Sequence, residues 1–549
     1  MACLVRRSGT AAALALMAAS TLVIPADAQV SREMAGFGRV DIMTVPLDGK
    51  IMLRSATYTP RGRVLISYAA PGDKDERDLK LALIDEDGRN MLPVFAGQVP
   101  VRAKDNGIRF MVFADNRRIH LGDFILECLP DLERCTRSQL VPVRYPDGLA
   151  VGDHVAHRWS EVIVSPDNRH VAWTTLFANF SALAFVGELR RTADVYTIEN
   201  PRIISTLDPF APDPRHADGV IPRPVGGGEV KQFVQGGTAI SLVGAGRRDT
   251  PDSVVQDLAS NALRPVTDTP GYTETTIFSP DERLGLTMTT RFSPKTDPAI
   301  LGLVPRPYPG ALNMGLGMFA YTYAVTGVRG AREGNVGPAL IDIAESERQP
   351  EYLGLNLSTE PDWVFHSPMS WNPQGTRGIW IEGQRGTGKL RIRQVALPER
   401  KPAAVVTPRP FRVAEAYKPF RSDMAPAFAK ASREQNVKVY GKAAGYITYR
   451  RQQDGRIEKA YYDFDDGDGA IYQGRETLQA NPASNSTYVA DLTVKGTHRG
   501  EMKLKITFGA LGNPLPSKIV FEKDATGARL SSGHAQYDGV RLNVADLAP

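Results

Sequence analysis

The sequence predicts an all-β protein whose larger part is built from a repeated hairpin. From about Val40 to about Leu397, short runs of β-branched and aromatic residues alternate with turn residues, and no long stretch shows the period of an amphipathic helix. The chain also contains 50 glycines and 40 prolines, which are scattered between the apolar runs rather than clustered. This distribution is typical of many short strands joined by tight turns.

The repeated hairpin has a recognisable form: an apolar residue, a small polar residue, proline, a polar turn, arginine and an apolar strand. In Ser165-Pro166-Asp167-Asn168, the proline presets φ for the turn, and the Asp and Asn side chains can cap it or accept a positive φ. Apolar residues stand on both sides of this turn, so it is expected to join two strands. Four copies align at their prolines, at residues 58–67, 164–173, 278–287 and 371–380.

The spacing of the copies predicts a propeller. Successive prolines of the repeat lie 106, 114 and 93 residues apart. A four-stranded propeller blade takes roughly 40–50 residues, so each gap fits two blades better than one. Degenerate copies without the proline are expected at 106–113, 236–246 and 333–343. We therefore expect a six- or seven-bladed β-propeller over residues 29–397.

The motif apolar-Ser-Pro-Asp-x-Arg, followed by an apolar strand, resembles the repeat of TolB-like β-propellers, the periplasmic relatives of WD-repeat propellers. The resemblance covers about 360 residues and implies a β-propeller architecture. It does not indicate a catalytic or binding activity, because the repeated motif is a turn. Prolyl-oligopeptidase-type peptidases also carry such repeats. They need a Gly-x-Ser-x-Gly nucleophile elbow on an α/β-hydrolase domain, and this sequence has neither.

The N-terminus has the pattern of a secretory signal peptide. Arg6 and Arg7 precede an apolar run from Ala11 to Ile24, and Ala26-Asp27-Ala28 supplies small residues for cleavage. The apolar run is too short for a membrane anchor. We expect a signal peptide over residues 1–28, a periplasmic or secreted mature protein, and no membrane insertion.

The charge and the cysteine content bear on two questions: whether the protein binds nucleic acid, and whether it contains a disulfide. Lys and Arg exceed Asp and Glu by 66 to 61, without a concentrated basic stripe, so no nucleic-acid partner is expected. Cys128 and Cys135 remain after signal cleavage, and in an oxidising compartment they are expected to form one local disulfide. A metal site made from them would need a second cysteine pair, which the sequence lacks.

The last part of the chain differs from the repeats. Residues 398–435 are rich in proline, interleaved with Lys, Arg and Ala, and are expected to form a linker with a short helix over 425–433. Residues 436–549 contain alternating short strands and predict an antiparallel β barrel or sandwich. The acidic run Asp463–Gly469 fails the spacing of an EF-hand and predicts a hairpin turn instead.

Candidate ligand-binding residues lie just upstream of the repeat turns. If the strand before each turn lines the central channel, six polar residues gather there. They are His157, Glu161, Tyr272, Glu274, Asp362 and His366. His157, Glu161 and His366 could together hold a divalent metal, the possible cofactor. This set resembles in outline the His-lined metal centre of propeller-type oligogalacturonate lyases. The alternative is that these residues are solvated channel walls.

Two functions are compatible with these patterns. The first is an exported propeller that acts as a binding or scaffold protein and engages a protein or carbohydrate ligand in the cell envelope. The alternative is a propeller-type enzyme, a metal-assisted lyase or hydrolase that acts on an extracellular polymer. The sequence alone leaves open whether the protein is an enzyme.

Overall fold

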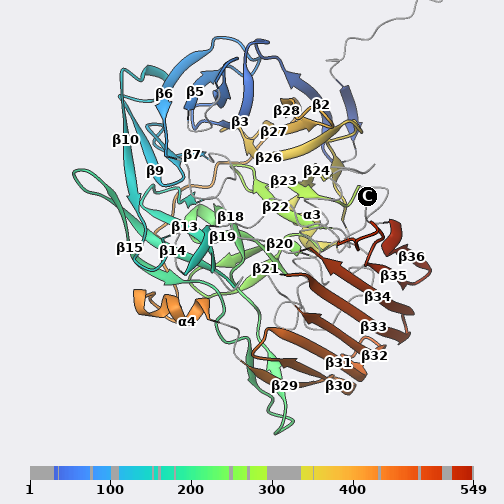
Figure 1. Ribbon diagram of the computed structural model, residues 1–549. Helices are drawn as coiled ribbons and strands as arrows, with labels where there is room; N and C mark the ends of the chain where they lie inside the picture. Colours follow the sequence, from blue (N-terminus) through green and yellow to red (C-terminus); the bar gives the residue numbers. More distant parts are fainter. Residues whose placement is uncertain are drawn as a thin grey trace, which may run out of the picture.

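The fold is that of a ring of antiparallel β-sheets with a separate β-sheet beside it (Figure 1). The computed structural model describes residues 30–34, 36–73, 78–100, 110–150, 154–158, 162–177, 181–245, 251–268, 272–292, 336–349, 352–430, 434–479, 484–509 and 522–546. The predicted signal peptide lies outside these residues. The predicted all-β class is confirmed, because strands dominate the described chain and its helices are single turns or little more.

Five sheets of the described residues form the ring, and we divide them into units that we call blades 1 to 6. Blades 2 and 3 belong to one nine-stranded sheet, in which their outermost strands pair parallel. Blade 1 contains β3 (Met52–Tyr58), β4 (Val64–Ala69), β5 (Asp78–Ile84) and β6 (Leu92–Gln98). Blade 2 contains β7 (Phe110–Val112), β8 (Arg118–Leu121), β9 (Phe124–Leu129) and β10 (Arg137–Arg144), with η1 (Leu132–Arg134) before β10. Blade 3 contains β11 (Val155–Arg158), β12 (Ile163–Val164), β13 (His170–Phe177), β14 (Ala182–Arg191) and β15 (Tyr196–Ile203).

The second half of the ring continues the same order. Blade 4 contains β18 (Glu229–Val234), η2 (Gln235–Gly237), β19 (Ala239–Ala245), β20 (Pro251–Asp257) and β21 (Leu263–Pro265). Blade 5 contains β22 (Thr273–Phe278), β23 (Leu284–Thr289), β24 (Gly337–Asp342), α3 (Ile343–Arg348) and β25 (Leu355–Asn356). Blade 6 contains β26 (Trp363–Trp371), β27 (Arg377–Gln384) and β28 (Leu390–Ala396).

Blade 6 is completed by the N-terminal end of the described chain. Strand β2 (Gly38–Val45) pairs antiparallel with β28, and β1 (Val30–Met34) pairs with β2 at the outer edge. The two ends of the ring are therefore held by the main-chain hydrogen bonds of one sheet. Because these bonds join residues more than 340 positions apart, the ring closes only when both ends of the propeller are present.

The repeat turns are shaped by residues with positive φ. Five turns have one such residue each, namely Gly62 (88°), Asn116 (57°), Asn168 (61°), Glu282 (57°) and Gly375 (66°), and the blade 4 turn has three in succession, Gln235 (56°), Gly236 (71°) and Gly237 (96°). Gly and Asn are the residues that accept this conformation most readily. The turns that lack proline, in blades 2 and 4, share the feature, so positive φ is more constant in this repeat than the proline. We call the end of the ring that carries these turns the turn face.

Adjacent turns also pack against each other. A Cβ placed on Gly375 of blade 6 would lie 3.3 Å from Pro280 of blade 5, and one placed on Gly237 would lie 3.2 Å from Pro166 of blade 3. The same contact joins Gly62 to Pro373. In these three pairs of blades, the proline of one turn fits against a glycine of the neighbouring turn.

One of the spacing predictions is wrong. The first two gaps between repeat copies do span two blades, with blades 2 and 4 between them. The third gap spans only one step, from blade 5 to blade 6. Residues 337–342, expected to open a degenerate blade, form β24, which pairs directly with β23 of blade 5. The extra length lies between these two paired strands, in a segment that extends outside the described residues.

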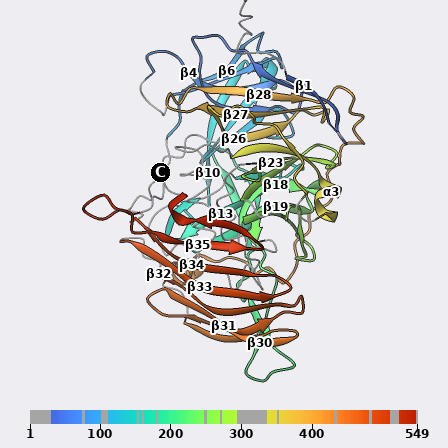
Figure 2. The same cartoon turned by 90° about the vertical axis from the view of Figure 1, so that its right-hand side faces the viewer.

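The C-terminal part of the chain, for which an antiparallel β barrel or sandwich was predicted, is antiparallel β-structure and forms one eight-stranded sheet, which we call the C-terminal sheet (Figure 2). Its strands follow in chain order: β29 (Gln435–Tyr440), β30 (Ala444–Arg451), β31 (Arg456–Asp465), β32 (Ala470–Gln479), β33 (Ser486–Gly496), β34 (Gly500–Phe508), β35 (Ser532–Tyr537) and β36 (Val540–Asn543), with η5 (Val544–Asp546) at its end. Asp463–Gly469 forms the β31–β32 turn as expected, with Asp465 accepting bonds from the amides of Gly467 and Gly469.

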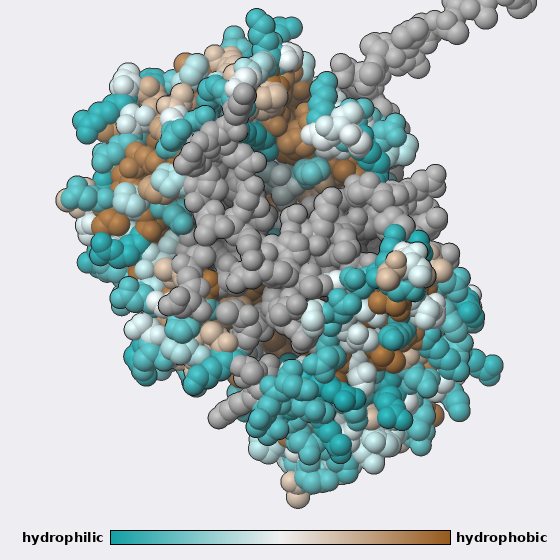
Figure 3. Space-filling model, in the orientation of Figure 1, coloured by the Kyte–Doolittle hydropathy of each residue, from teal (hydrophilic) through white to brown (hydrophobic). Residues whose placement is uncertain are grey.

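The C-terminal sheet has one buried and one exposed face. Along β33, Tyr488, Ala490 and Leu492 are buried, whereas Val489 and Asp491 are exposed. The buried face joins the same hydrophobic cluster as residues of blades 5 and 6. The hydrophilic colouring at the lower right of Figure 3 agrees with a solvated outer surface. The hairpin formed by β16 (Phe210–Pro212) and β17 (Val220–Pro222) also reaches this sheet, where Asp218 contacts Lys438 at 3.2 Å.

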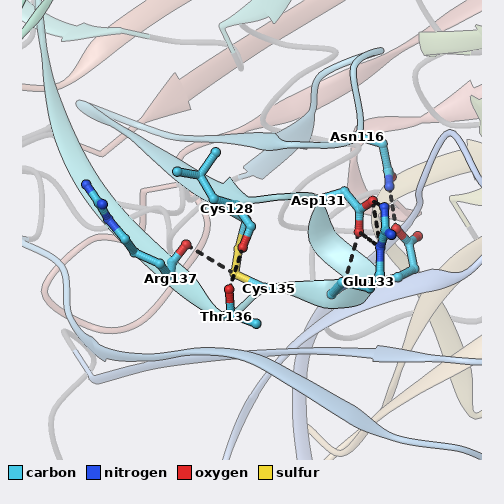
Figure 4. The surroundings of a disulfide bond; sticks show 9 residues. Asn116, Cys128, Asp131, Glu133, Cys135, Thr136 and Arg137 are labelled. Carbon is cyan, nitrogen blue, oxygen red and sulfur yellow. Dashed lines mark hydrogen bonds and ion pairs between the residues drawn. A yellow bond between two sulfur atoms is a disulfide. The ribbon is translucent and has the colours of Figure 1, made fainter.

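The predicted disulfide is present in blade 2, between Cys128 and Cys135, with Cα atoms 5.2 Å apart. It closes a loop whose two acidic residues point to one side (Figure 4). The carboxylates of Asp131 and Glu133 in this loop form ion pairs with Arg61 of the blade 1 turn, whose Nη1 lies 3.0 Å from Asp131 Oδ2 and 3.1 Å from Glu133 Oε2. The hydrogen bond from Arg134, together with Arg61, lowers the pKa of Asp131 to about 2. The disulfide loop therefore joins blade 1 to blade 2.

Candidate functional site

The inner strands of the ring share a distortion that sequence patterns do not show. The strand before each repeat turn lies at one edge of its sheet, as the channel prediction assumed, and neighbouring inner strands approach each other around the ring. A β-bulge or register shift interrupts the pairing of β3, β11, β18, β22 and β26. Bulges change the direction of a side chain, and they are common at barrel rims and near functional sites.

Two of the bulged residues form a charged cluster between blades 4 and 5. Lys231 stands at the bulge of β18 and Glu274 at the bulge of β22. The Lys231 ammonium lies 3.2 Å from a Glu274 oxygen and 3.0 Å from Glu229, and the Tyr272 hydroxyl donates to Glu274 at 2.8 Å. The Lys231 side chain is 6% exposed. One ammonium and two carboxylates thus meet in a buried cluster that joins two blades.

The structure thus brings together two of the predicted channel residues, Tyr272 and Glu274. Sequence reasoning missed Lys231 and Glu229, although their spacing of two places them on one face of a strand. Glu161 lies outside the described residues. His157 lies on β11, and its side chain is not among those described.

The remaining two predicted channel residues belong to blade 6. Asp362 is exposed in the turn that precedes β26, where its carbonyl accepts the Arg385 amide at 2.8 Å. His366 is half-buried, and its ring lies against Gly383 of the neighbouring strand, where a Cβ would stand 2.7 Å from Nε2. His366 therefore packs across its own hairpin. Within the described part of the chain, no group of three or more His, Cys, Asp or Glu residues is arranged to hold a metal ion.

The turn face carries a second feature, which the sequence led us to interpret differently. Residues 398–420, predicted as part of a proline-rich linker, form an extended segment without regular secondary structure that packs along the turns. We call this segment the strap. It leaves blade 6 after β28, crosses blades 5 and 4, and reaches blade 3 before η4 (Ser422–Met424) and α4 (Ala425–Ala429) (Figure 1). The helix was expected over 425–433, and it is shorter, because the described Lys430 that follows Ala429 is in an extended conformation.

The strongest contact of the strap is an ion pair with the third repeat copy. Arg400 Nη2 lies 2.7 and 2.9 Å from the two oxygens of Asp281, which also accepts the Ser279 hydroxyl at 2.7 Å and the Ala403 amide at 2.9 Å. Burial alone would raise the pKa of Asp281, but these hydrogen bonds outweigh it and hold the pKa below its usual value. The aspartate of the Ser-Pro-Asp turn therefore has two roles: it accepts a hydrogen bond within the turn, and it accepts hydrogen bonds from Arg400 and Ala403 of the strap.

Main-chain hydrogen bonds continue this contact across the ring. The Val406 amide donates to Pro280 of blade 5, the Arg409 amide to Gly236 of blade 4, and the Ala414 amide to Leu258 of blade 4, at 2.7–2.9 Å. These bonds are sequence-independent, because they use backbone groups on both sides. They show that the turn face accepts an extended polypeptide.

At blade 3 the strap pairs with the outermost strand of the blade, β15, at residues beyond those that pair with β10. The Phe420 amide donates to Pro201 at 2.8 Å, and the Ile203 amide donates to Lys418 at 3.0 Å. Nearby, the Phe411 ring stacks on His170 at a centroid distance of 3.7 Å. The strap therefore lies along the sheet as a short added strand, with aromatic contact to the second repeat copy.

A cleft of about 610 Å³ lies between blade 3 and the strap. Its blade side comes from β14 and β15, around a register shift at Gly187, and its strap side comes from residues 411–413 and 419–420. Charged residues Glu188, Arg202 and Arg412 line it beside the apolar Phe411, Val413 and Phe420. No residue of this cleft was among the predicted site residues, because its two walls are more than 200 positions apart in the sequence.

Comparisons with known proteins give only distant similarity. No family model matches the chain, and no curated protein sequence matches it. A protein assigned as TolB from Agrobacterium tumefaciens shares 9% identity with a TM-score of 0.30, covering 68% of this chain and 85% of that one. Oligogalacturonate lyase from Vibrio parahaemolyticus shares 10% with a TM-score of 0.37, covering 68% and 97%. TolB from Acinetobacter baumannii shares 14% with a TM-score of 0.31, covering 64% and 67%.

Proposed function

We propose that this protein is an exported β-propeller that acts as a binding or scaffold protein and engages a polypeptide ligand in the cell envelope. The proposal rests on the way in which the strap is bound. The turn face holds an extended segment of its own chain through main-chain hydrogen bonds from Val406, Arg409 and Ala414, and through the Arg400–Asp281 ion pair. Main-chain pairing with an extended segment is a common way to bind a peptide.

Export rests on the N-terminal pattern and on the disulfide. The segment from Arg6 to Ala28 has the features of a signal peptide. The Cys128–Cys135 bond agrees with an oxidising compartment, where such bonds persist. None of the helices in the described residues is long and apolar enough to cross a membrane. We infer a periplasmic or secreted mature protein.

A polypeptide is favoured over a carbohydrate by the kind of groups that the turn face presents. Backbone carbonyls of Pro280, Gly236 and Leu258 point at the strap and accept amide donors. Amide donors recur along every polypeptide, whereas a sugar chain offers hydroxyl groups at other spacings. The metal-assisted enzyme remains an alternative proposal. Its three candidate metal ligands are His157, Glu161 and His366, and the side chains of His157 and Glu161 are not among those described.

The proposal is tested by capture from an envelope extract with the purified mature protein. Wild-type protein is compared with Phe411→Ala, which removes an aromatic contact of the strap, and with Lys495→Ala on the C-terminal sheet as a control. We expect one or more envelope proteins to be retained by the wild type and the control, and retained less by Phe411→Ala. Equal retention by all three would contradict the proposal. Stoichiometric divalent metal in the same preparation, lost together with a lyase or hydrolase activity in His366→Ala, would favour the enzyme.

A further inference from the structure

The cleft between blade 3 and the strap has an unusual balance of charge. Its lining contains two arginines, Arg202 and Arg412, and a single carboxylate, Glu188. Among the described residues, none of these three side chains has an oppositely charged partner within 4.0 Å. Arg202 Nη1 donates to the Tyr417 carbonyl at 3.0 Å, and Glu188 accepts the Asn200 amide at 3.2 Å, so both have neutral partners only. The cleft thus carries an excess positive charge that no residue of the cleft neutralises.

Most of the other lining residues are apolar, and they are joined by the polar Asn200 and His170. Phe411, Val413 and Phe420 come from the strap, and Pro201 and Val186 from the blade. Phe411 is fixed by its stacking on His170, whose Nδ1 lies 3.0 Å from Asp167 of the repeat turn. Apolar walls with a few charged groups are typical of ligand sites, and the volume of about 610 Å³ falls within their range of roughly 300–1,000 Å³.

The same edge of blade 3 already binds main chain. Pro201 and Ile203 exchange hydrogen bonds with the strap at Phe420 and Lys418. The strap therefore shows that an extended polypeptide fits beside these residues. A ligand of the cleft would lie beside this edge, among the guanidinium groups of Arg202 and Arg412 and the ring of Phe411.

We propose that this cleft binds the carboxyl-terminal end of an extended polypeptide. The terminal carboxylate pairs with Arg412 and Arg202, and an apolar last side chain packs among Phe411, Val413 and Phe420. Arginine suits this task because its planar group binds a carboxylate through two parallel hydrogen bonds. Glu188 provides an acceptor for a main-chain amide of the ligand. This inference rests on the proposed function and names the part of the polypeptide that is recognised.

A uronic-acid saccharide also carries carboxylates, but it presents hydroxyl groups where the cleft presents Phe411, Val413 and Phe420. Burying hydroxyl groups against these side chains without hydrogen-bond partners is unfavourable. The apolar walls therefore favour the peptide.

The test uses three defined probes on the purified full-length protein: acetyl-Ala-Pro-Leu with a free carboxylate, the same peptide as its carboxyl-terminal amide, and a uronic-acid trisaccharide. Calorimetric titration is expected to show the acid binding about tenfold or more tightly than the amide, because charge-assisted hydrogen bonds are lost in the amide. Arg412→Ala should remove this preference. Its side chain is exposed and pairs with no described residue, so folding is expected to be unchanged.

Arg409→Ala is the matched control, since Arg409 lies on the same strap but does not line the cleft. It should keep the preference for the acid. Equal binding of acid and amide, absence of binding at millimolar concentration, or binding of the trisaccharide alone would each overturn the inference. If envelope proteins are still captured in that case, only the carboxyl-terminal recognition fails. If capture fails as well, the proposed function fails with it.

Discussion

Replacing Arg400 by alanine is expected to loosen the strap and lower the stability of the propeller. The Asp281 side chain is 1% exposed and that of Arg400 is 11% exposed, so the pair is nearly free of solvent screening. Removing one partner of a buried ion pair costs about 3–5 kcal/mol, because the other charge stays buried. Ser279 and the Ala403 amide still hold Asp281 in the variant. We therefore expect a loss near the lower limit, about 3 kcal/mol.

Urea denaturation followed by tryptophan fluorescence measures this loss. The Arg400 guanidinium lies 5.8 Å from the centre of the Trp371 ring, so the probe is close to the change. Arg409→Ala serves as the control and should change stability by less than about 0.5 kcal/mol, as is usual for an exposed side chain. Limited proteolysis should cut the strap of Arg400→Ala faster than that of the wild type.

The effect of Arg400→Ala should also depend on pH in a defined direction. The pKa of Asp281 is lowered in the folded state. Its stabilising contribution is therefore present above the unfolded pKa of about 3.9 and is lost as the pH falls through the folded value. The difference between wild type and variant should be large at pH 7 and shrink below about pH 4. A difference under about 0.5 kcal/mol at pH 7, or one that does not change with pH, would refute the role assigned to this pair.

Three further predictions follow from other parts of the molecule. Replacing both Cys128 and Cys135 by serine should lower stability by about 2.5 kcal/mol, from the entropy of a loop of this size, and thermal unfolding of the oxidised and reduced protein would measure it. Lys231→Ala should cost about 3 kcal/mol because Glu229 and Glu274 stay buried without this cation, whereas the double variant Lys231→Met with Glu274→Gln should recover part of the loss in the same urea assay. N-terminal sequencing of the protein from an expressing bacterial host should begin at Gln29, and a chain that still begins at Met1 would contradict export.

The all-β class and the hairpin turns could be predicted because their causes are local. Proline, aspartate and asparagine set the geometry of the Ser165–Asn168 turn within a few residues, and period-two patterns mark the strands. The disulfide was predictable for the same reason, since Cys128 and Cys135 are seven residues apart and no other cysteine remains in the expected mature chain. The propeller followed from repetition of one local unit.

What the sequence did not reveal depends on contacts between distant residues. Nothing in the local pattern at Lys231 or Glu274 indicates that each stands at a bulge or that the two meet across blades. The 93-residue gap suggested two blades, because an insertion between β23 and β24 cannot be distinguished from a degenerate blade by spacing alone. The strap was taken as a linker because its proline content matches that of a spacer, whereas Arg400 and Phe411 acquire their roles only against Asp281 and His170.

Site-specific photo-crosslinking in the intact envelope would decide whether the turn face and its strap form a polypeptide-binding surface. A photoreactive amino acid at position 412, on the strap where it lines the cleft, is compared with the same group at position 495 on the C-terminal sheet. Both residues are exposed, so each probe is free to react. We predict a discrete protein adduct at position 412 that is absent at position 495. Equal labelling at the two positions, or no adduct at 412, would contradict a binding role for this face.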